Sequence, residues 1–266
     1  MPTALNIVIT GGSSGLGLAL AQHYAREGHQ IGLIARDPAK LASAIEQLKT
    51  ASPQCRAEFR SADVIDPAAA SAAIEQLAES MGGIDILINS AGILREGRFE
   101  DVPLASFREV MDINLFGTIN ISRAALPYLK SSRGQLVNIA SMAAFSGVFG
   151  YTAYTASKHA LAGFTESLRY EMKPQGVTVQ MICPPEFDSP MVEELNTYRS
   201  PENRAHTQMV PVEPMDVIVR DTVKAIASKR YLTVTGFRAK CAALGIRYFP
   251  GVTRMIADRI IRGAQN

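Results

Sequence analysis

Short runs of consecutive apolar residues recur along the chain and alternate with longer stretches in which apolar residues return at helical spacing. The runs read LNIVIT, QIGLIA, IDILIN, QLVNIA and VTVQMIC, and they begin at residues 5, 30, 84, 135 and 177. Apolar runs separated by helix-length segments are typical of parallel strands that are buried on both faces of a sheet. The pattern therefore predicts an α/β fold in which helices cover both faces of a doubly wound parallel sheet, a Rossmann-type fold.

This rhythm has no internal repeat, low-complexity tract or linker that would divide the chain. Its 266 residues suit one α/β domain with a sizeable core, so we expect a single domain over residues 1–266. Two segments depart from the pattern. Residues 186–213, inside a polar stretch rich in proline, are expected to form a mobile lid over the substrate, and residues 237–266 a basic helical extension.

Composition excludes several other classes of protein. With 47% apolar and 20% charged residues, the chain is neither disordered nor a membrane bundle, and a net charge of +2 does not indicate nucleic acid as a partner. Cys55, Cys183 and Cys241 are scattered and lack metal-ligand spacing, so we expect no metal site and no disulfide framework. We see no leader peptide and no membrane-spanning stretch, which favours the cytoplasm.

The first apolar run leads directly into the glycine-rich sequence TGGSSGLG and then into a predicted helix. Gly11, Gly15 and Gly17 at such a turn let the backbone approach a pyrophosphate, whose charge meets the N-terminus of the helix. Ser13 and Ser14 add hydroxyl donors. The turn predicts a dinucleotide site, although a glycine-rich turn can also be purely structural.

The end of the second run indicates which dinucleotide would bind. An NAD-binding fold usually has a carboxylate there, whereas this chain has Arg36, with Lys40 four residues further on. A guanidinium can pair with a 2′-phosphate that a carboxylate would repel, so the sequence favours NADP(H). Asp63, at the end of the third predicted strand, is placed to meet the adenine or else to serve as the acid of a helical N-terminal turn.

Tyr154 and Lys158 lie one helical turn apart, within the sequence YTASK. A tyrosine phenol has a pKa near ~10, so proton exchange near neutral pH calls for a cation that favours the phenolate. An ammonium on the same helix face can supply it. A surface tyrosine lying against a lysine stem is the alternative interpretation.

In order along the chain, TGGSSGLG, NSAG, Asn114, Ser141 and YTASK resemble the motifs of the short-chain dehydrogenase/reductase family. The resemblance implies the Rossmann-type fold, an NADP(H) cofactor and the catalytic residues Asn114, Ser141, Tyr154 and Lys158. Tyr154 would be the general acid for ketone reduction, Ser141 would hold the carbonyl oxygen, and Asn114 would hold a water that links Lys158 to solvent. The positions expected to bind the cofactor are Gly11, Ser13, Ser14, Gly15, Leu16, Gly17, Arg36, Lys40, Asp63, Val64, Asn89, Ala91, Gly92, Tyr154 and Lys158.

Within the family, the segments GRFEDV, FGYTAYTASKHAL, EMKPQGV and CPPEFDSPMVEE resemble reductases of a long-chain amino ketone. Pro185 stands where most family members have glycine. Glu186, Asp188, Glu193 and Glu194 give the predicted lid an acidic edge. That edge could attract an ammonium group, but solvated charges are the commoner explanation.

Residues 237–262 combine basic side chains with apolar residues near helical spacing. This could be a peripheral contact with a membrane, although Gly245 and Pro250 shorten any helix, so packing against the body or a second subunit is the favoured interpretation. The family's habit of pairing through helices around 103–130 and 151–173 predicts a homodimer or homotetramer.

Three functions remain open for the sequence. The first is an NADPH-dependent reductase of a sphingoid ketone, or of another carbonyl or alcohol substrate. The others are a catalytically silent nucleotide sensor and an interaction module that keeps the fold for assembly only. The complete Ser141, Tyr154 and Lys158 set argues against the silent sensor, and both alternatives predict that no carbonyl oxidises the cofactor.

Overall fold

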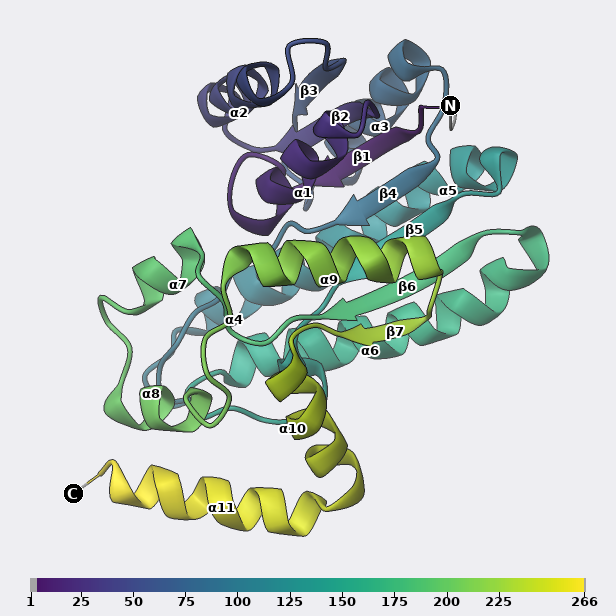
Figure 1. The fold of residues 1–266 in the computed structure, drawn as a ribbon. Helices are drawn as coiled ribbons and strands as arrows, with labels where there is room; N and C mark the ends of the chain where they lie inside the picture. The colour runs from purple at the N-terminus through teal and green to yellow at the C-terminus, as the bar shows by residue number, and fades with distance from the viewer. Residues whose placement is uncertain (1–3, 266) are drawn as a thin grey trace.

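The fold is a parallel sheet with helices on both faces, and Figure 1 looks onto one of these faces. The computed structural model describes residues 4–265, so residues 1–3 and residue 266 of the predicted domain, including the start of the segment searched for a leader, lie outside the described residues. The sheet has seven strands in the order β3-β2-β1-β4-β5-β6-β7, all pairs parallel. The strands are β1 (Asn6–Thr10), β2 (Gln30–Ala35), β3 (Ala57–Ser61), β4 (Ile86–Asn89), β5 (Gln135–Ile139), β6 (Thr178–Cys183) and β7 (Leu232–Val234).

The five apolar runs of the sequence form β1, β2, β4, β5 and β6, which confirms the doubly wound sheet. Successive residues of β1 point to opposite faces, so that Ile7 and Ile9 join one core cluster and Val8 the other. The strand β7 was not predicted. It has three residues, none of them fully buried, so it leaves no continuous apolar run in the sequence.

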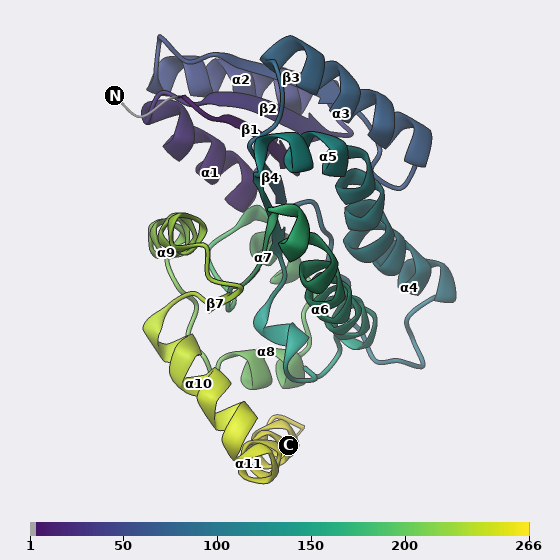
Figure 2. The ribbon, with the colours of Figure 1, turned by 90° about the vertical axis from the view of Figure 1, so that its right-hand side faces the viewer.

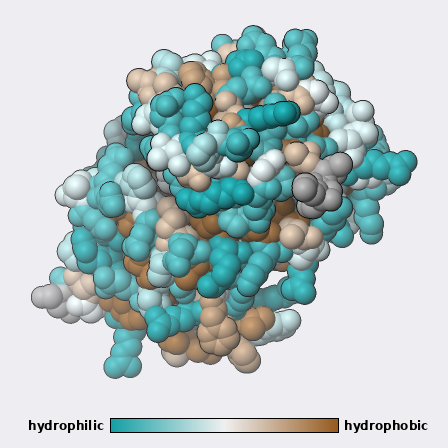
Figure 3. Space-filling view, turned by 45° about the horizontal axis from the view of Figure 1, so that its top comes forward, coloured by the Kyte–Doolittle hydropathy of each residue, from teal (hydrophilic) through white to brown (hydrophobic). Residues whose placement is uncertain are grey.

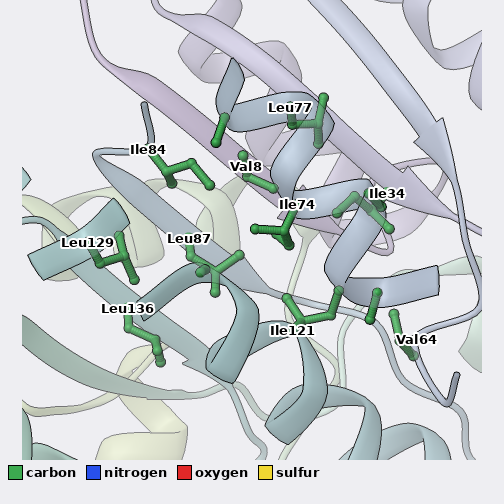
Figure 4. Close-up of a cluster of buried hydrophobic side chains, with 14 of the residues drawn as sticks. Val8, Ile34, Val64, Ile74, Leu77, Ile84, Leu87, Ile121, Leu129 and Leu136 are labelled. Atoms are coloured by element: carbon green, nitrogen blue, oxygen red, sulfur yellow. The ribbon is translucent and has the colours of Figure 1, made fainter. Parts of the chain in front are cut away.

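Two groups of helices cover the two faces of the sheet. On one face, α1, α2 and α9 bury apolar side chains against the sheet; on the other, α3 and α5, together with part of α6, form the cluster drawn in Figure 4. The helices are α1 (Gly15–Arg26), α2 (Pro38–Ala51), α3 (Pro67–Met81), α4 (Leu104–Met111), α5 (Thr118–Ser132), α6 (Thr152–Met172), α7 (Pro190–Leu195), α8 (Pro201–Thr207), α9 (Met215–Ser228), α10 (Phe237–Tyr248) and α11 (Pro250–Gly263).

The strand order reverses between β1 and β4, because the chain first builds the sheet outward from β1 to β3 and then returns to β1's other side. At such a point the loops that follow neighbouring strands separate, and ligands of open α/β sheets bind in the crevice between them. The glycine turn follows β1 and the NSAG sequence follows β4. The fold therefore places both motifs at this crevice.

The segment 186–213 is less irregular than its composition suggests. It contains the short helices α7 and α8, which begin at Pro190 and Pro201 after the serine N-caps Ser189 and Ser200. Its two ends meet, since Phe187 pairs with Glu213 in an isolated parallel bridge. The segment thus leaves the body of the protein and returns to it at one place.

Residues after β7 form two helices that extend away from the sheet, with α11 at the far end of the molecule (Figures 1 and 2). Helix α10 ends where Pro250 starts α11, and α11 packs beside α8. The face in Figure 3 is largely hydrophilic, with hydrophobic residues visible in patches across its middle and along its lower edge. Within residues 4–265, no helix combines the length and the hydrophobicity that crossing a bilayer requires.

Candidate active site

A cavity of about 850 Å³ opens at the carboxyl ends of the strands. Its walls come from the glycine turn, from the loops after β4, β5 and β6, from the segment 186–213 and from both C-terminal helices. The volume is near the upper end of the range for small-molecule sites, roughly 300–1,000 Å³. Three of the four predicted catalytic residues, Ser141, Tyr154 and Lys158, line it.

The glycine turn is packed so closely that side chains are excluded from it. Gly11 has φ +65°, and a Cβ there would lie 2.9 Å from the Cα of Ala91. Gly15 also adopts a left-handed conformation, with φ +52°. A Cβ on Gly17 would overlap the carbonyl oxygen of Gly11. The turn therefore holds β1, the loop after β4 and the start of α1 in contact, and it leaves bare backbone facing the cavity.

We expect Gly17→Ala to remove dinucleotide binding together with part of the stability, because the new methyl group meets backbone that cannot move aside. The predicted loss of unfolding free energy is about 1–3 kcal/mol, and dinucleotide affinity should fall at least about tenfold, which corresponds to 1.4 kcal/mol. Urea unfolding and NADPH fluorescence titration measure the two effects. The matched control is Gly163→Ala in α6, where a Cβ meets open space; it should stabilise by about 0.5–1 kcal/mol and leave binding unchanged.

The N-terminus of α1 offers donors for an anion. Ser14 is its N-cap residue, but the Ser14 side chain makes no capping hydrogen bond and lines the cavity. Leu16 and Gly17 in the first turn also line the cavity. Ser13 is half-buried and lies outside the lining. An uncommitted hydroxyl, free backbone N–H groups and a positive helix end fit a pyrophosphate.

Past the end of β2, the basic pair predicted for a 2′-phosphate is exposed. Within residues 4–265, the side chains of Arg36 and Lys40 make no hydrogen bond or ion pair. The neighbouring carboxylate is committed elsewhere: Asp37 caps α2 by accepting from the backbone N–H groups of Ala39 and Lys40. Of the charges at this strand end, the two cations are therefore free to meet a phosphate.

Asp63 lies in the turn that follows β3, and its carboxylate accepts a hydrogen bond from the N–H of Ile65 at 3.1 Å. The acid that caps the next helix, α3, is Asp66. Asp63 is thus the acid of the turn before the helix and not of the helical N-terminal turn itself, and it does not line the cavity. The buried Val64 beside it anchors the turn, because its carbonyl accepts from Asn120 at 3.0 Å.

The Asn89 side chain is held by a buried hydrogen-bond network. Its amide nitrogen donates to Ser122 and to Asn138, which in turn donates to Thr165. This network is buried between the sheet and the helices α5 and α6, so the Asn89 side chain faces the core and not the cavity. Ala91 and Gly92, further along NSAG, do line the cavity.

Ser141 and Tyr154 meet over the end of β5. The Ser141 hydroxyl oxygen accepts from the N–H of Ala143 at 3.1 Å, which caps the 3-10 helix η2 (Met142–Ala144). Burial raises the pKa of the Tyr154 phenol to about 12, and a hydrogen bond with Ser141 opposes the rise. This direction differs from the lowering of the pKa that the sequence predicts, because burial outweighs the opposing hydrogen bond with Ser141. The phenol is protonated at neutral pH.

Lys158 lies beside the phenol and is itself buried, with 5% of its surface exposed. Its ammonium nitrogen donates to the carbonyl oxygen of Ile139 at 3.1 Å and lies 5.6 Å from the centroid of the Tyr154 ring. Burial lowers the pKa of Lys158 to about 8. The group therefore carries a charge at neutral pH and can lose it within a mildly alkaline range.

Asn114 lies in a π-helical segment, η1 (Asp112–Gly117), between α4 and α5. Such segments widen a helix by one residue per turn and often mark functional sites. The Asn114 amide oxygen accepts from Ile93, and its nitrogen donates to the Ile93 carbonyl and to Ser157. A Cβ on Gly92 would lie 3.1 Å from this amide oxygen and 3.9 Å from the Lys158 ammonium. Asn114 thus holds the loop after β4 close to Lys158.

The acidic edge expected on the segment 186–213 is reduced by an ion pair. Both carboxylate oxygens of Glu186 accept from Arg199, at 2.9 and 2.7 Å, and the Arg199 guanidinium is almost fully buried. Glu186 is therefore neutralised and is not available to attract an ammonium group. Asp188, Glu193 and Glu194 are exposed, as solvated charges would be.

Several features of the site were not predicted from the sequence. Arg199 also donates to the side-chain oxygen of Asn203, and the Asn203 amide nitrogen donates to the carbonyl of Phe149. Asn203 therefore ties α8 both to the Glu186–Arg199 ion pair and to the loop before α6. The C-terminal helices, expected to pack on the body or a partner, form a wall of the cavity. Most of the lining is apolar, and it includes Leu94, Phe145, Val148, Met191, Ile246 and Ile261.

The part of the chain that contains the predicted catalytic residues matches a known family. Residues 5–200 match the family model described as short chain dehydrogenase. A 3-dehydrosphinganine reductase from Danio rerio is 35% identical over 234 residues, which are 84% of this chain and 70% of that protein. A 3-ketodihydrosphingosine reductase from Bos taurus is 35% identical over 223 residues, which are 82% of this chain and 67% of that protein.

Two solved structures share the architecture. Levodione reductase superimposes with a TM-score of 0.81 at 25% sequence identity, over 90% of this chain and 99% of that one. A short-chain dehydrogenase from Sphingobium yanoikuyae, solved in complex with NADPH, gives a TM-score of 0.74 at 27% identity, over 86% of each chain. The family model ends at residue 200, so α8, α9, β7, α10 and α11 lie beyond the part it matches.

Proposed function

Because the chain belongs to the short chain dehydrogenase family, we propose that it is an NADPH-dependent reductase that converts 3-ketodihydrosphingosine to dihydrosphingosine. One observation carries the proposal: Ser141, Tyr154 and Lys158 converge on a large, mostly apolar cavity that the glycine turn also lines. The similarity to two named reductases of this ketone supports the substrate.

The residues present fit NADPH. Bare backbone at Gly11 and Gly17, the free Ser14 hydroxyl and the unpaired Arg36 and Lys40 suit a pyrophosphate and a 2′-phosphate. When bound, the cofactor supplies the hydride that reduces the ketone carbon. The complex of a related dehydrogenase with NADPH supports this choice.

The chain's own residues handle the proton and the oxygen. Ser141 donates a hydrogen bond to the substrate oxygen and stabilises the negative charge that develops there. Tyr154 transfers its phenolic proton to that oxygen as the carbon–oxygen double bond becomes single. The Lys158 ammonium then stabilises the phenolate that remains. Asn114 acts as a positioning residue, since it fixes the loop beside Lys158.

The experiment that tests the proposal is NADPH oxidation, followed by absorbance, with 3-ketodihydrosphingosine, a short acyclic ketone, a cyclic diketone and a steroid ketone as parallel substrates. We expect the highest kcat/KM for the sphingoid ketone and formation of dihydrosphingosine by mass spectrometry. If only the short or cyclic ketones react, the sphingoid substrate is wrong and a reductase of another carbonyl remains. If no carbonyl oxidises NADPH although NADPH binds, the chain is a silent nucleotide-binding protein.

We expect Arg36→Ala to weaken the preference for NADPH over NADH. Loss of a charged hydrogen-bonding partner of a phosphate costs about 1.5–3 kcal/mol, roughly tenfold to hundredfold in kcat/KM for NADPH. The value for NADH should stay within about twofold, because NADH lacks the phosphate. Arg26→Ala, an exposed arginine at the end of α1, is the matched control. Equal losses with both cofactors would contradict the assignment.

We further propose that two or four copies assemble through the helices near residues 103–130 and 151–173. Exposed apolar side chains on these helices support the assembly. Leu104 on α4, Phe116 on η1 and Tyr170 on α6 have 64%, 52% and 62% of their surfaces exposed. Phe99, which precedes α4, has 67% exposed. Sedimentation velocity of the full chain, compared with a Leu104→Glu/Phe116→Glu variant, tests it. A wild-type monomer would contradict the assembly.

A further inference from the structure

Helices α10 and α11 each expose apolar side chains on one side. We call α10 and α11 together, which meet at a wide angle before Pro250, the C-terminal hairpin, and we call this side its outer face (Figures 1 and 2). Phe249 has 66% of its surface exposed and Met255 62%, although such side chains are usually buried. On α11, Val252, Met255 and Ile256 follow the spacing of a single helix face. The outer face consists of Phe237, Leu244, Tyr248, Phe249, Val252, Met255 and Ile256.

The opposite side of the same helices lines the cavity. On α11 the lining residues Thr253, Ala257 and Ile261 recur at intervals of four, roughly opposite Val252, Met255 and Ile256. On α10 the lining residues include Ala242 and Ile246. The hairpin is therefore the layer of protein that separates the interior of the cavity from whatever covers the outer face.

Charge at the hairpin differs from charge elsewhere in the chain. Residues 237–266 contain six basic side chains and one acidic side chain, Asp258, so this segment carries a net charge of +5 while the whole chain carries +2. The other residues together are therefore acidic, at −3. Of the basic groups, Lys240 pairs with Asp221 at 3.4 Å, whereas Arg247 lies over the Tyr248 ring on the outer face.

We propose that the outer face of the C-terminal hairpin binds the surface of a membrane that contains anionic lipids, with α10 and α11 lying in the plane of the interface. Exposed aromatic and aliphatic side chains beside arginines are the composition of helices that bind this way. A second copy of the chain is a poorer occupant, because two such faces would bring two segments of like, basic net charge together. An anionic bilayer supplies both the apolar phase and the opposite charge.

The membrane contact also determines where the cavity lies relative to the bilayer. With the outer face in the lipid headgroups, the lining residues of the hairpin face the cavity directly above the bilayer. A ketone with a long alkyl chain could then pass between bilayer and cavity without crossing bulk water, where its apolar chain is unfavourable. Only this last use of the contact rests on the proposed sphingoid substrate.

The test is co-sedimentation of the full chain with vesicles of phosphatidylcholine alone and of phosphatidylcholine mixed with phosphatidylglycerol. We expect binding to the mixed vesicles that falls as salt is raised, and at least about tenfold weaker binding to phosphatidylcholine alone. Val252→Ser/Met255→Ser should weaken binding at least about tenfold through lost apolar burial. Arg247→Glu/Arg259→Glu should do the same through lost attraction, at about 1 kcal/mol for each basic residue.

Matched controls change similar residues away from the hairpin. Ile65→Ser alters an exposed apolar side chain after β3, and Arg26→Glu/Arg56→Glu alters exposed arginines; both variants should bind like the wild type. Negligible binding to either kind of vesicle, or equal binding to both, overturns the proposal. So does a concentration-dependent dimer that Val252→Ser/Met255→Ser abolishes, since a second copy would then cover the face. Tyr154→Phe should bind vesicles normally, which separates failure of the contact from failure of the proposed activity.

Discussion

Tyr154→Phe is expected to lower kcat for ketone reduction by about 10²–10⁴-fold, the contribution that a positioned general acid makes. The substitution removes one oxygen atom and keeps the ring. At neutral pH the phenol of Tyr154 is protonated, because burial raises its pKa to about 12, so the wild-type residue is in the form that can donate. Stopped-flow or steady-state NADPH oxidation with saturating ketone measures the loss.

Two measurements distinguish this loss from structural damage. NADPH affinity, measured by fluorescence, should change less than about threefold, because the phenol oxygen is not part of the phosphate-binding turn. Tyr151→Phe is the matched control: Tyr151 lines the same cavity and packs edge to face on Tyr154 with 5.7 Å between ring centroids. It should retain most activity. Near-normal turnover by Tyr154→Phe would defeat the proton-donor assignment.

Lys158→Met is expected to abolish most activity while making the protein more stable. Loss of a cation that stabilises developing negative charge costs about 10²–10³-fold in kcat. Burial lowers the pKa of Lys158 from its ordinary 10.5 to about 8. At neutral pH the folded protein therefore keeps a charged ammonium in a buried position, which lowers its stability. One pKa unit corresponds to 1.36 kcal/mol, so a methionine of similar length should gain about 3 kcal/mol, less the lost hydrogen bond to Ile139.

The pH dependence of stability tests whether the buried charge of Lys158 causes the gain expected for Lys158→Met. The unfolded chain binds more protons at Lys158 than the folded protein does between about pH 8 and 10.5, so wild-type stability rises with pH across this interval. The advantage of Lys158→Met, measured by urea unfolding at several pH values, should therefore be largest near pH 7 and shrink above pH 8. Wild-type turnover should decline above the same pH as the ammonium is lost. Lys158→Arg keeps a buried charge and should show no gain; an equal gain there would contradict the cause.

The sheet and the pairing of Tyr154 with Lys158 were predictable from the sequence because both depend on local patterns. A buried parallel strand needs an unbroken apolar run, and the residues from Ile7 to Ile9 provide one. Tyr154 and Lys158 share a face of any α-helix that contains both of them. The strand β7 was missed because an edge strand of three residues pairs on one side and needs no such run.

The remaining differences depend on contacts between segments far apart in the chain. Whether Asn89 faces a cofactor or the core is decided by Asn138 and Ser122, which lie more than 30 residues away. Glu186 is neutralised by Arg199 on the far side of α7. The pKa of Tyr154 follows from burial that only the folded protein provides. None of these partners can be recognised from spacing alone.

The proposed catalytic residues and the C-terminal wall of the cavity come from different parts of the chain. The residues proposed to act on the substrate all precede residue 200, where the family match ends, while one wall of the cavity comes from helices after residue 236. Transplanting that terminal pair onto another scaffold of the same ancestry, or exchanging it for a foreign pair, would alter which molecules are admitted and leave proton donation untouched. The terminus is thus a natural unit for engineering selectivity.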